Sequence, residues 1–521
     1  MRPPDSTYGL SLAELARGLG LTFLGEDVLA RGLTEDSRTA RAGDIFVAIK
    51  GLGHDGRDYI DAAKRAGAVA VLLEAPDAPV GPRLLYEGKT GFRQLVTRLA
   101  QAVYQNPDRQ LELVGVTGTN GKSSICYLLE AILLAQGQKA GVMGTINYRW
   151  PGQIRTAPNT TPEGPLLFQT LADMARDKCQ SVVMEVSSHA LDLGRVAGLE
   201  FSWALFTNLT QDHLDFHDNI ANYFQAKKRL FFERLKKDGA VRAVVGVDDA
   251  HGRELRTELG SRAYGYGFSA DAEIRGEIIR RDLNGLTLLI HSPFGEWEQT
   301  SPLIGSYNAL NILGTVGLAG LMGVPVPMIQ KALATAKGAP GRLEAVASPP
   351  ETLVLVDYAH SPGALETVLK ALRQLKPNRL LAIFGCGGDR DRLKRPLMGE
   401  AVARGADLAI LTSDNPRTEE PLAIIAEARV GLSRLNVPLL TEKEAAMSQR
   451  GYLVEPDRRK AINLAASILQ RGDILLIAGK GHEDYQIINR EKWPFDDRLV
   501  ARQALELAFS QSAGQKGAEC P

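Results

Sequence analysis

A short glycine-rich stretch followed by a lysine and two serines is the clearest candidate for chemistry. Residues 117–124 read Thr-Gly-Thr-Asn-Gly-Lys-Ser-Ser, between an apolar run at 111–116 and a helical pattern at 125–134. Glycines let backbone amides turn toward phosphate oxygens, and the N-terminus of the following helix adds a favourable dipole. Lys122 and Ser123 have the types and spacing expected for binding terminal phosphates and magnesium. We therefore predict a phosphate loop for a nucleoside triphosphate, although an ordinary glycine-rich turn has a similar pattern.

Acidic and imidazole side chains follow the next apolar runs. Glu185 lies in the run 182–186, and residues 207–217 contain two histidines and two aspartates, His213 among them. A carboxylate on a strand beside the phosphate loop can complete a magnesium shell that Ser123 begins. For a single histidine, a structural hydrogen bond is the default role. The density of ligand-type side chains favours a metal site instead.

One lysine is placed on an apolar helix face. Phe224, Lys227, Phe231 and Leu235 fall at helical spacing along one stripe. Lys227 is therefore expected to point inward, whereas Lys228 is turned about 100° away and is expected to be solvated. The alternative for Lys227 is a buried stem with its ammonium in water.

Parallel strands with crossover helices must position these residues. Short runs rich in Val, Ile and Leu recur, each followed by a polar or glycine-rich turn and then a helical pattern. The clearest runs are 111–116, 182–186, 204–206, 243–247, 353–356, 380–384, 408–411 and 474–477. Ligands of open α/β sheets bind beyond the carboxyl ends of the strands. The polar clusters after these runs are therefore candidate site walls.

Three such clusters lie in the last third of the chain. They are Gly-Cys-Gly-Gly-Asp-Arg-Asp at 385–391, Asp-Asn-Pro-Arg at 414–417 and Gly-Lys-Gly-His-Glu at 479–483. Each follows an apolar run, so the three converge on one rim if the strands are parallel. Asn-Pro also favours a tight turn, which is compatible with a binding site.

Composition and length predict a multidomain α/β protein. The chain has 521 residues, of which 44% are hydrophobic and 23% charged. Interruptions at 106–109 and 339–342 suggest domains at 1–107, 108–340 and 341–521, and the polar tail from Ser510 suggests disorder. Lys plus Arg and Asp plus Glu both number 61, so no global field favours nucleic acid or an anionic membrane.

The spacing of the cysteines and the length of the apolar segments indicate the cellular compartment. The four cysteines lack paired metal-ligand spacing, which argues against a zinc site and a disulfide framework and fits a reducing cytosol. No segment approaches the roughly 20 apolar residues that a membrane span needs. We expect a cytoplasmic protein without a membrane span.

In their order along the chain, these motifs resemble the Mur ligase family. The resemblance covers nearly the whole chain, through 118–124, 185–189, Asn208 with 212–217, Ser-Tyr-Asn-Ala-Leu-Asn at 306–311, Gly341-Arg342 and Asp-Tyr-Ala-His at 357–360. It implies a central P-loop ATPase domain on a parallel sheet. An N-terminal α/β UDP-sugar-binding domain and a C-terminal Rossmann-like amino-acid-binding domain would flank it.

The resemblance also implies a reaction. ATP phosphorylates a substrate carboxylate, an amine attacks the acyl phosphate, and an amide, ADP and phosphate result. It assigns catalysis to Lys122, Lys227, His213 and Glu185, and magnesium to Ser123, Glu185, His213 and Lys227 after Lys227 is carbamylated by carbon dioxide. The ATP-binding residues that it implies are Gly118, Thr119, Asn120, Gly121, Lys122, Ser123, Ser124, Asn308, Arg342, Asp357 and His360.

Further segments resemble the members that extend UDP-N-acetylmuramoyl-L-alanyl-D-glutamate in peptidoglycan precursor synthesis. These are Thr-Glu-Asp-Ser-Arg at 34–38 and Gly-His-Asp-Gly at 53–56, although the latter could be a plain loop. The implied UDP-muramoyl-dipeptide residues are Ser37, Asn159, Thr160, Thr161, Ser187 and Arg195. Arg195 could instead be a surface residue.

The tetrad at 414–417 is the version associated with meso-diaminopimelate. The implied binding residues for this amino acid are Arg390, Asp414, Asn415, Pro416, Arg417, Gly479 and Glu483. The alternatives are L-lysine as the amine, a folylpolyglutamate synthetase-like ligase, or a nucleotide-gated regulatory protein that forms no bond. The expected partners are these small molecules, without nucleic acid, and the chain is expected to be a monomer.

Overall fold

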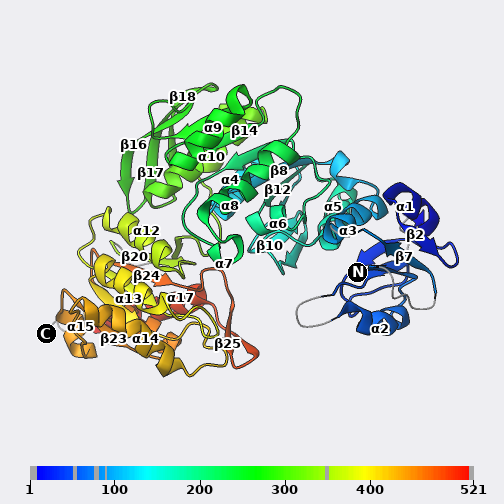
Figure 1. Ribbon diagram of the computed structural model, residues 1–521. Helices are drawn as coiled ribbons and strands as arrows, with labels where there is room; N and C mark the ends of the chain where they lie inside the picture. Colours follow the sequence, from blue (N-terminus) through cyan, green and yellow to red (C-terminus); the bar gives the residue numbers. More distant parts are fainter. Residues whose placement is uncertain (1–8, 51–54, 75–80, 89–90, 347–350, 516–521) are drawn as a thin grey trace. The chain divides into compact units, whose positions relative to one another are not determined.

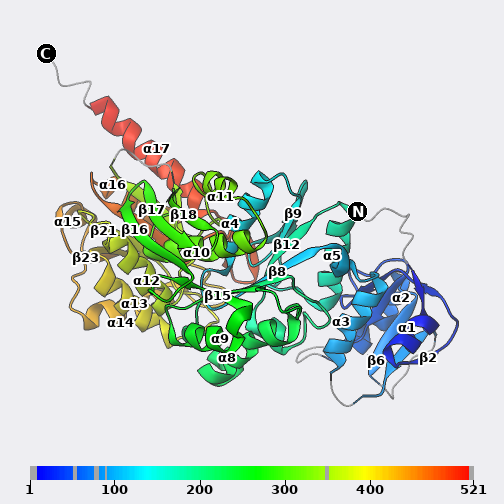
Figure 2. The same ribbon diagram turned by 90° about the horizontal axis from the view of Figure 1, so that it is seen from above.

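The chain folds into α/β domains built around three main sheets (Figures 1 and 2). The computed structural model describes residues 9–50, 55–74, 81–88, 91–346 and 351–515, so Gly53 and His54 lie outside the described residues. One compact unit comprises Met1–Gly276, Ile290–Trp297 and Leu310–Ala332, and the other comprises Glu277–Leu289, Glu298–Ala309 and Leu333–Pro521. Within the described ranges, no helix has both the length and the apolar character that a membrane crossing requires.

The N-terminal sheet has five strands in the order β2-β7-β6-β5-β4. They span Thr22–Leu24, Arg83–Tyr86, Ala70–Glu74, Asp44–Val47 and Gly32–Thr34, and the helices α1, α2 and α3 span Leu12–Leu19, Ile60–Arg65 and Phe92–Val103. Neighbouring strands from β4 to β7 are parallel, whereas β2 is antiparallel. Ile45 and Leu72 pack with α3 residues in the core on one side of this sheet.

Helix α3 joins the N-terminal sheet to the central one. It lies against α5, Gly164–Arg176, in both views (Figures 1 and 2). A Cβ atom at Gly164 would lie 2.6 Å from Thr97 Oγ1, so only glycine allows this approach. Thr97 Oγ1 also donates to Gly194 O at 3.1 Å. Helix α5 also contacts β4 of the N-terminal sheet.

The central sheet has the strand order β11-β10-β9-β12-β8-β13-β14-β15-β16-β17-β18. Its strands β8 to β15 span Glu112–Thr117, Ala140–Met143, Asn147–Trp150, Gln153–Thr156, Ser181–Glu185, Trp203–Phe206, Ala243–Gly246 and Ala263–Gly267; β16, β17 and β18 span Ile274–Asp282, Gly285–Ser292 and Gly295–Ser301. The six neighbouring strands β9-β12-β8-β13-β14-β15 are parallel to one another. Helix α4, Lys122–Ala135, packs on β8, β9 and β12, and α9, Ala250–Leu259, packs on β14 and β15. The predicted parallel α/β architecture is confirmed.

The C-terminal sheet has six strands in the order β19-β20-β24-β21-β22-β23. They span Glu344–Val346, Leu353–Asp357, Ile474–Ala478, Leu380–Phe384, Leu408–Leu411 and Gly451–Val454. Leu355 and Phe384 face a core with α12, α13 and α14, which span Pro362–Arg373, Lys394–Gly405 and Pro421–Arg434. Val354 and Ile383 face the opposite core with α16, Arg458–Ile468, and α17, Asp497–Gln515. Figure 2 shows α16 and α17 on the other side of this sheet from α12, α13 and α14. Helix α17 extends past Ser510, so the predicted disorder there is wrong through Gln515.

The register of this sheet brings the predicted polar clusters together. Asp357 of β20 pairs with Ala478 of β24, and Phe384 of β21 pairs with Leu411 of β22, all in parallel strands. Strand β24 also pairs with β21. The segments after β20, β21, β22 and β24 therefore emerge at one edge, and the predicted convergence is confirmed. We call 385–391, 414–419 and 479–483 the amino-acid rim, after the binding role that the family resemblance predicts for residues in them.

Candidate active site

The phosphate loop, residues 118–124, connects β8 to α4 in the predicted strand-loop-helix order. Gly118 has φ +133°, and a Cβ atom there would overlap Thr207 Oγ1. Gly121 has φ +89°, and its Cβ atom would lie 2.5 Å from Asn311 Oδ1. Both positions combine a left-handed backbone with a close neighbour, so the loop requires glycine at each.

Asn208, in the segment after β13, holds the phosphate loop. Its carbonyl accepts from Thr119 N at 2.9 Å, and its side-chain Oδ1 accepts from Asn120 N at 3.1 Å. Thr210 N donates to Thr119 Oγ1 at 3.1 Å. The loop is thus fixed by the neighbouring strand end as well as by its own helix.

Two lysines meet at one backbone carbonyl beside this loop. Lys122 Nζ donates to Gly118 O at 3.0 Å and to Thr119 O at 2.8 Å, and Lys227 Nζ donates to Gly118 O at 2.9 Å. Lys227 is 1% exposed, so its predicted inward orientation is confirmed. Burial lowers the pKa of Lys227 well below its usual range; the Lys122 ammonium lowers it further, and Asp212 acts in the opposite direction.

Lys228 is buried rather than solvated, so that prediction is wrong. On α8, Ile220–Arg229, its side chain faces α9 and is only 11% exposed. Its ammonium lies 2.5 Å from Glu258 Oε1 and 3.5 Å from Glu254 Oε1. The two acidic residues offset the loss of hydration, and helical spacing within α8 alone does not reveal them.

Ser123 and Glu185 form an oxygen-rich pair at the start of α4. Ser123 Oγ donates to Glu185 Oε1 at 2.8 Å, and Thr145 N donates to the same oxygen at 2.9 Å. A Cβ atom at Gly144 would overlap Glu185 Oε1, so glycine leaves space for this carboxylate. Hydroxyl and carboxylate oxygens are the ligands that magnesium prefers, so the pair fits that ion.

The predicted metal ligand His213 lies in a cluster of aromatic rings. Its side chain is 48% exposed, with Nε2 at 3.6 Å from Asp212 Oδ2, and its ring centroid lies 4.9 Å from that of His189. The buried His217 lies with Nε2 at 2.9 Å from Ser188 Oγ. In the described part of the chain, no three His, Cys, Asp or Glu side chains are arranged to hold a metal ion.

The residues proposed for the muramoyl-dipeptide meet beside Glu185. Thr161 Oγ1 donates to Glu185 O at 2.8 Å and accepts from Ser187 N at 3.0 Å. Arg195 Nη1 donates to Thr161 O at 3.1 Å, so Arg195 is not a free surface residue. The neighbouring Thr160 Oγ1 lies 3.0 Å from Thr145 Oγ1, and Asn159 O accepts from Tyr148 OH at 2.5 Å.

Ser37 lies in a turn after β4, near a group of charged residues. Thr39 N donates to Asp36 O at 3.0 Å within this turn. Burial raises the pKa of the adjacent Glu35 to about 7, and the Glu163 carboxylate adds to this, while Arg93 and Arg195 act in the opposite direction. Arg195 Nη2 lies 2.8 Å from Glu163 Oε1. The Ser37 turn and Arg195 therefore share one electrostatic environment.

This environment predicts a pH-dependent stability. A carboxyl group whose folded pKa is about 7 and whose ordinary value is 4.5 binds more protons in the folded state, so wild-type stability is lost as pH rises from about 4.5 to 7. Glu35→Gln removes this loss. We expect the melting temperature of the variant to rise relative to that of the wild type as the pH is increased from 5 to 8. Glu74→Gln, at an exposed position ending β6, is the control, and a pH-independent difference for Glu35→Gln would refute the assignment.

Among the residues predicted to hold ATP in the C-terminal unit, Asp357 ends β20, Arg342 and His360 lie close to it, and Asn308 lies in α10, Ser306–Leu321. The buried Asp357 accepts from Leu343 N and Ala359 N, both at 2.8 Å. The guanidinium of Arg342 lies 4.7 Å from the Tyr358 ring centroid. His360 is exposed, with Nδ1 at 2.6 Å from Tyr358 O. Asn308 is buried, and its Nδ2 donates to Ile304 O at 2.8 Å.

A buried lysine lies among the acidic and amide groups of the amino-acid rim. Lys480 Nζ donates to Asn415 Oδ1 at 3.2 Å and to Glu483 Oε2 at 3.1 Å, and it lies 3.7 Å from Asp414 Oδ1. Asn415 Nδ2 donates to Glu483 Oε2 at 3.0 Å. The left-handed Gly479, with φ +116°, connects β24 to this group. The rim thus holds carboxylates in fixed directions.

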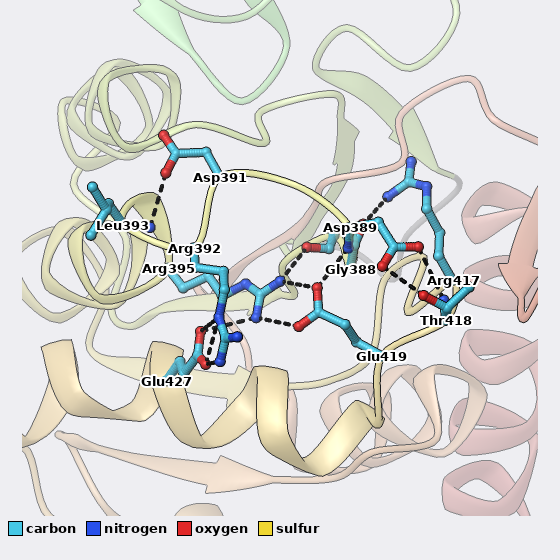
Figure 3. A network of polar contacts seen from close by, with 11 residues as sticks. Gly388, Asp389, Asp391, Arg392, Leu393, Arg395, Arg417, Thr418, Glu419 and Glu427 are labelled. Atoms are coloured by element: carbon cyan, nitrogen blue, oxygen red, sulfur yellow. Dashed lines mark hydrogen bonds and ion pairs between the residues drawn. The ribbon is translucent and has the colours of Figure 1, made fainter. Parts of the chain in front are cut away.

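Two arginines bring positive charge to the same rim. Arg390 is exposed in the segment after β21, and Arg417 follows Pro416 in the segment after β22. Arg417 Nη1 donates to Gly388 O at 2.7 Å (Figure 3). The Arg417 backbone donates to Ile487 O at 3.1 Å and accepts from Asn489 N at 2.7 Å, so it is fixed on both sides.

Sequence reasoning assigned no role to four residues that the structure places in these clusters. Thr145 contacts Glu185, Glu163 pairs with Arg195, Tyr148 supports Asn159, and Lys480 lies at the centre of the rim. Thr145 follows the apolar strand β9, and Lys480 follows β24, so the same strand-end rule could have found both. The contacts of Tyr148 and Glu163 have no comparable local signal.

Comparisons with known proteins match most of the chain. Three family models match stretches of this chain: the Mur ligase family catalytic domain matches 30–104, the Mur ligase middle domain matches 116–319, and the Mur ligase glutamate ligase domain matches 341–481. A Geobacter metallireducens protein named UDP-N-acetylmuramoyl-L-alanyl-D-glutamate–2,6-diaminopimelate ligase is 41% identical, with 97% of this chain and 100% of that protein covered. Its namesake in Geobacter sulfurreducens is 43% identical, with 90% and 93% covered. A solved structure with the same protein name is 32% identical, with a TM-score of 0.66 and 96% and 99% covered.

Proposed function

This chain belongs to the Mur ligase family, whose members are ATP-dependent, Mg²⁺-requiring enzymes that form amide bonds, and we propose which amide it forms. It joins meso-2,6-diaminopimelate to the D-glutamate carboxyl of UDP-N-acetylmuramoyl-L-alanyl-D-glutamate, a step of peptidoglycan precursor synthesis. The similar proteins of both Geobacter species carry the name of this activity.

The composition of the amino-acid rim is the observation that carries this proposal. The distal end of meso-diaminopimelate is a zwitterion, so its site needs groups of both signs. Arg390 and Arg417 supply cations, while Glu483, which accepts from Asn415 Nδ2, supplies a carboxylate within the same rim. Arg417 presents a planar fork suited to a carboxylate, and Glu483 can accept from an ammonium.

The phosphate loop is the proposed site for the ATP phosphates. Residues 118–124 supply backbone amides, Lys122 places its ammonium at the loop, and Ser123 with Glu185 would hold the magnesium ion. That ion, when bound, supplies charge neutralisation for phosphoryl transfer. By family resemblance, Asn308, Arg342, Asp357 and His360 also bind the nucleotide.

Lys227 is proposed to act as a carbamate. Its amine nitrogen attacks the carbon of carbon dioxide, a C–N bond forms as one C=O electron pair moves to oxygen, and the nitrogen releases a proton. Only a neutral amine does this, and the lowered pKa of the buried Lys227 favours that form. The product places an anion beside the Lys122 ammonium, and an anion suits a cation-rich phosphate site.

The sugar-dipeptide is proposed to bind near the Ser37 turn and Arg195. Thr160, Thr161, Ser187 and Asn159 lie with Arg195 next to Glu185, which would bring the substrate carboxylate toward the phosphate loop. After phosphorylation of that carboxylate, the amine nitrogen attacks the acyl carbon, the C–O bond to phosphate breaks, and the nitrogen releases a proton. His213 remains a proposed participant on family resemblance alone.

Acceptor-dependent release of phosphate tests this function. With ATP alone, and with ATP plus the UDP-muramoyl-dipeptide, we expect little steady release of phosphate. Adding meso-diaminopimelate should start rapid release with one amide formed per ATP. Steady ATP hydrolysis that ignores both acceptors would identify a nucleotide-driven switch and overturn the ligase proposal.

The domain boundaries, the oligomeric state and the cellular compartment are proposed from the same family. We propose domain boundaries at 1–107, 108–340 and 341–521, which contain the three matched stretches 30–104, 116–319 and 341–481. We also propose a monomer that acts in the cytoplasm on small-molecule substrates.

A further inference from the structure

A buried arginine beneath the amino-acid rim has no part in the chemistry described above. Arg395 is the second residue of α13 and is 1% exposed. A cation in the first turn of a helix opposes the helix dipole, and a buried charge costs several kcal/mol unless it is paired. A residue with both disadvantages must be compensated by specific partners.

Two carboxylates supply that compensation. Arg395 binds Glu419 through two parallel hydrogen bonds, Nη2 to Oε1 at 2.7 Å and Nη1 to Oε2 at 2.9 Å. Its Nη1 also donates to Oε2 of Glu427, on α14, at 2.9 Å. Nη2 donates to Gly387 O at 3.1 Å, so the guanidinium reaches the rim itself.

Glu419 links Arg395 to the two segments that carry Arg390 and Arg417. Its Oε1 accepts from Asp389 N at 2.6 Å, directly before Arg390. Asp389 in turn accepts from Thr418 Oγ1 at 2.7 Å and from Thr418 N at 3.2 Å, directly after Arg417. The segments carrying Arg390 and Arg417 are therefore cross-linked through one buried guanidinium (Figure 3).

The backbone needs such support at these two points. Asp389 has φ +51° and Arg417 has φ +52°, in the left-handed region that side chains other than glycine rarely adopt. Such a backbone conformation is strained and persists only when its surroundings fix it. If the cross-links were lost, the backbone would relax toward negative φ, and the direction of the arginine side chains would change.

We propose that Arg395 is a positioning residue which, through Glu419, Asp389 and Thr418, sets the separation of Arg390 and Arg417 and so fits the rim to a diamino dicarboxylic acid. This inference rests on the proposed function, because it assigns the two arginines to the carboxylates of that substrate. Arg395 itself touches no substrate.

Kinetics of Arg395→Lys, Glu419→Gln and Thr418→Val in the full chain test the proposal. Lysine cannot make the paired bonds to Glu419, and glutamine weakens them, while valine removes the hydroxyl bond to Asp389 with little change in shape. We expect each variant to raise KM for meso-diaminopimelate about tenfold, equivalent to about 1.4 kcal/mol. KM for ATP and for the UDP-muramoyl-dipeptide, and kcat at saturating amine, should stay within about twofold.

The controls separate positioning from folding and from the proposed function. Arg404→Lys makes the same change on the same helix at a 57% exposed arginine, and it should leave all three KM values unchanged. Thermal melting identifies variants that fold poorly. If Arg395→Lys and Glu419→Gln fold poorly, the kinetics of Thr418→Val decide the test. Equal increases in all three KM values, or an unchanged KM for the amine in folded variants, would overturn the proposal. Failure of the wild type to ligate would instead overturn the proposed function.

Discussion

Lys227→Ala is expected to lose ligation by a factor on the order of 10³, because the variant cannot form the carbamate anion that we propose beside the phosphate loop. Lys227 Nζ contacts Gly118 O in the wild type, so the substitution on α8 acts directly beside the loop that carries Lys122. The rate should be measured as phosphate release at saturating substrates. Small carboxylates such as acetate or formate should restore part of the activity, since they can occupy the space of the missing anion.

Lys228→Ala is the matched control for this prediction. Lys228 is the next residue on α8, and it is also largely buried, but it pairs with Glu254 and Glu258 of α9. Its removal should lower stability and leave turnover within a few-fold of wild type. A Lys227→Ala protein that ligates at the wild-type rate without additives would show that no carbamate is needed.

Arg417→Ala is expected to lower kcat/KM for meso-diaminopimelate by a factor on the order of 10³ while KM for ATP and for the UDP-muramoyl-dipeptide stays unchanged. Removing a charged partner from a site built for polar recognition leaves the substrate carboxylate unpaired, which costs far more than a lost methylene. L-Lysine lacks that carboxylate, so its slow use should change little. Steady-state kinetics with each amine measure both effects.

The backbone at Arg417 calls for a second substitution. Its φ of +52° suits asparagine better than alanine, so Arg417→Asn removes the guanidinium with less backbone strain. The two variants should lose the same selectivity. If Arg417→Asn used meso-diaminopimelate as well as the wild type does, the carboxylate would have to bind elsewhere.

Local patterns were sufficient to predict the framework of the site. Apolar runs such as 380–384 and 474–477 became parallel strands because Val, Ile and Leu in short runs suit a sheet buried on both faces. The glycines of the phosphate loop and the stripe that buries Lys227 follow equally local rules. The strand-end rule then located the polar clusters at the rim.

Contacts between distant segments were beyond those rules. Lys228 was expected in water because its partner Glu258 lies 30 residues away, on a helix whose packing the pattern of α8 does not encode. The Glu35 environment depends on Glu163 and Arg195, and Arg395 depends on Glu419 and Glu427. In each case, the environment of a charged residue is set by partners that are distant in the sequence and that only the fold brings close.

A direct competition between two amines tests the central claim most directly. The unmodified protein is incubated with ATP, Mg²⁺, UDP-N-acetylmuramoyl-L-alanyl-D-glutamate and equal concentrations of meso-diaminopimelate and L-lysine, and the products are separated by mass. We expect the diaminopimelate-containing tripeptide to exceed the lysine-containing one by a factor on the order of 10³ or more, because lysine lacks the distal carboxylate that Arg417 is proposed to bind. Equal amounts of the two products, an excess of the lysine product, or the absence of any tripeptide would contradict the assignment.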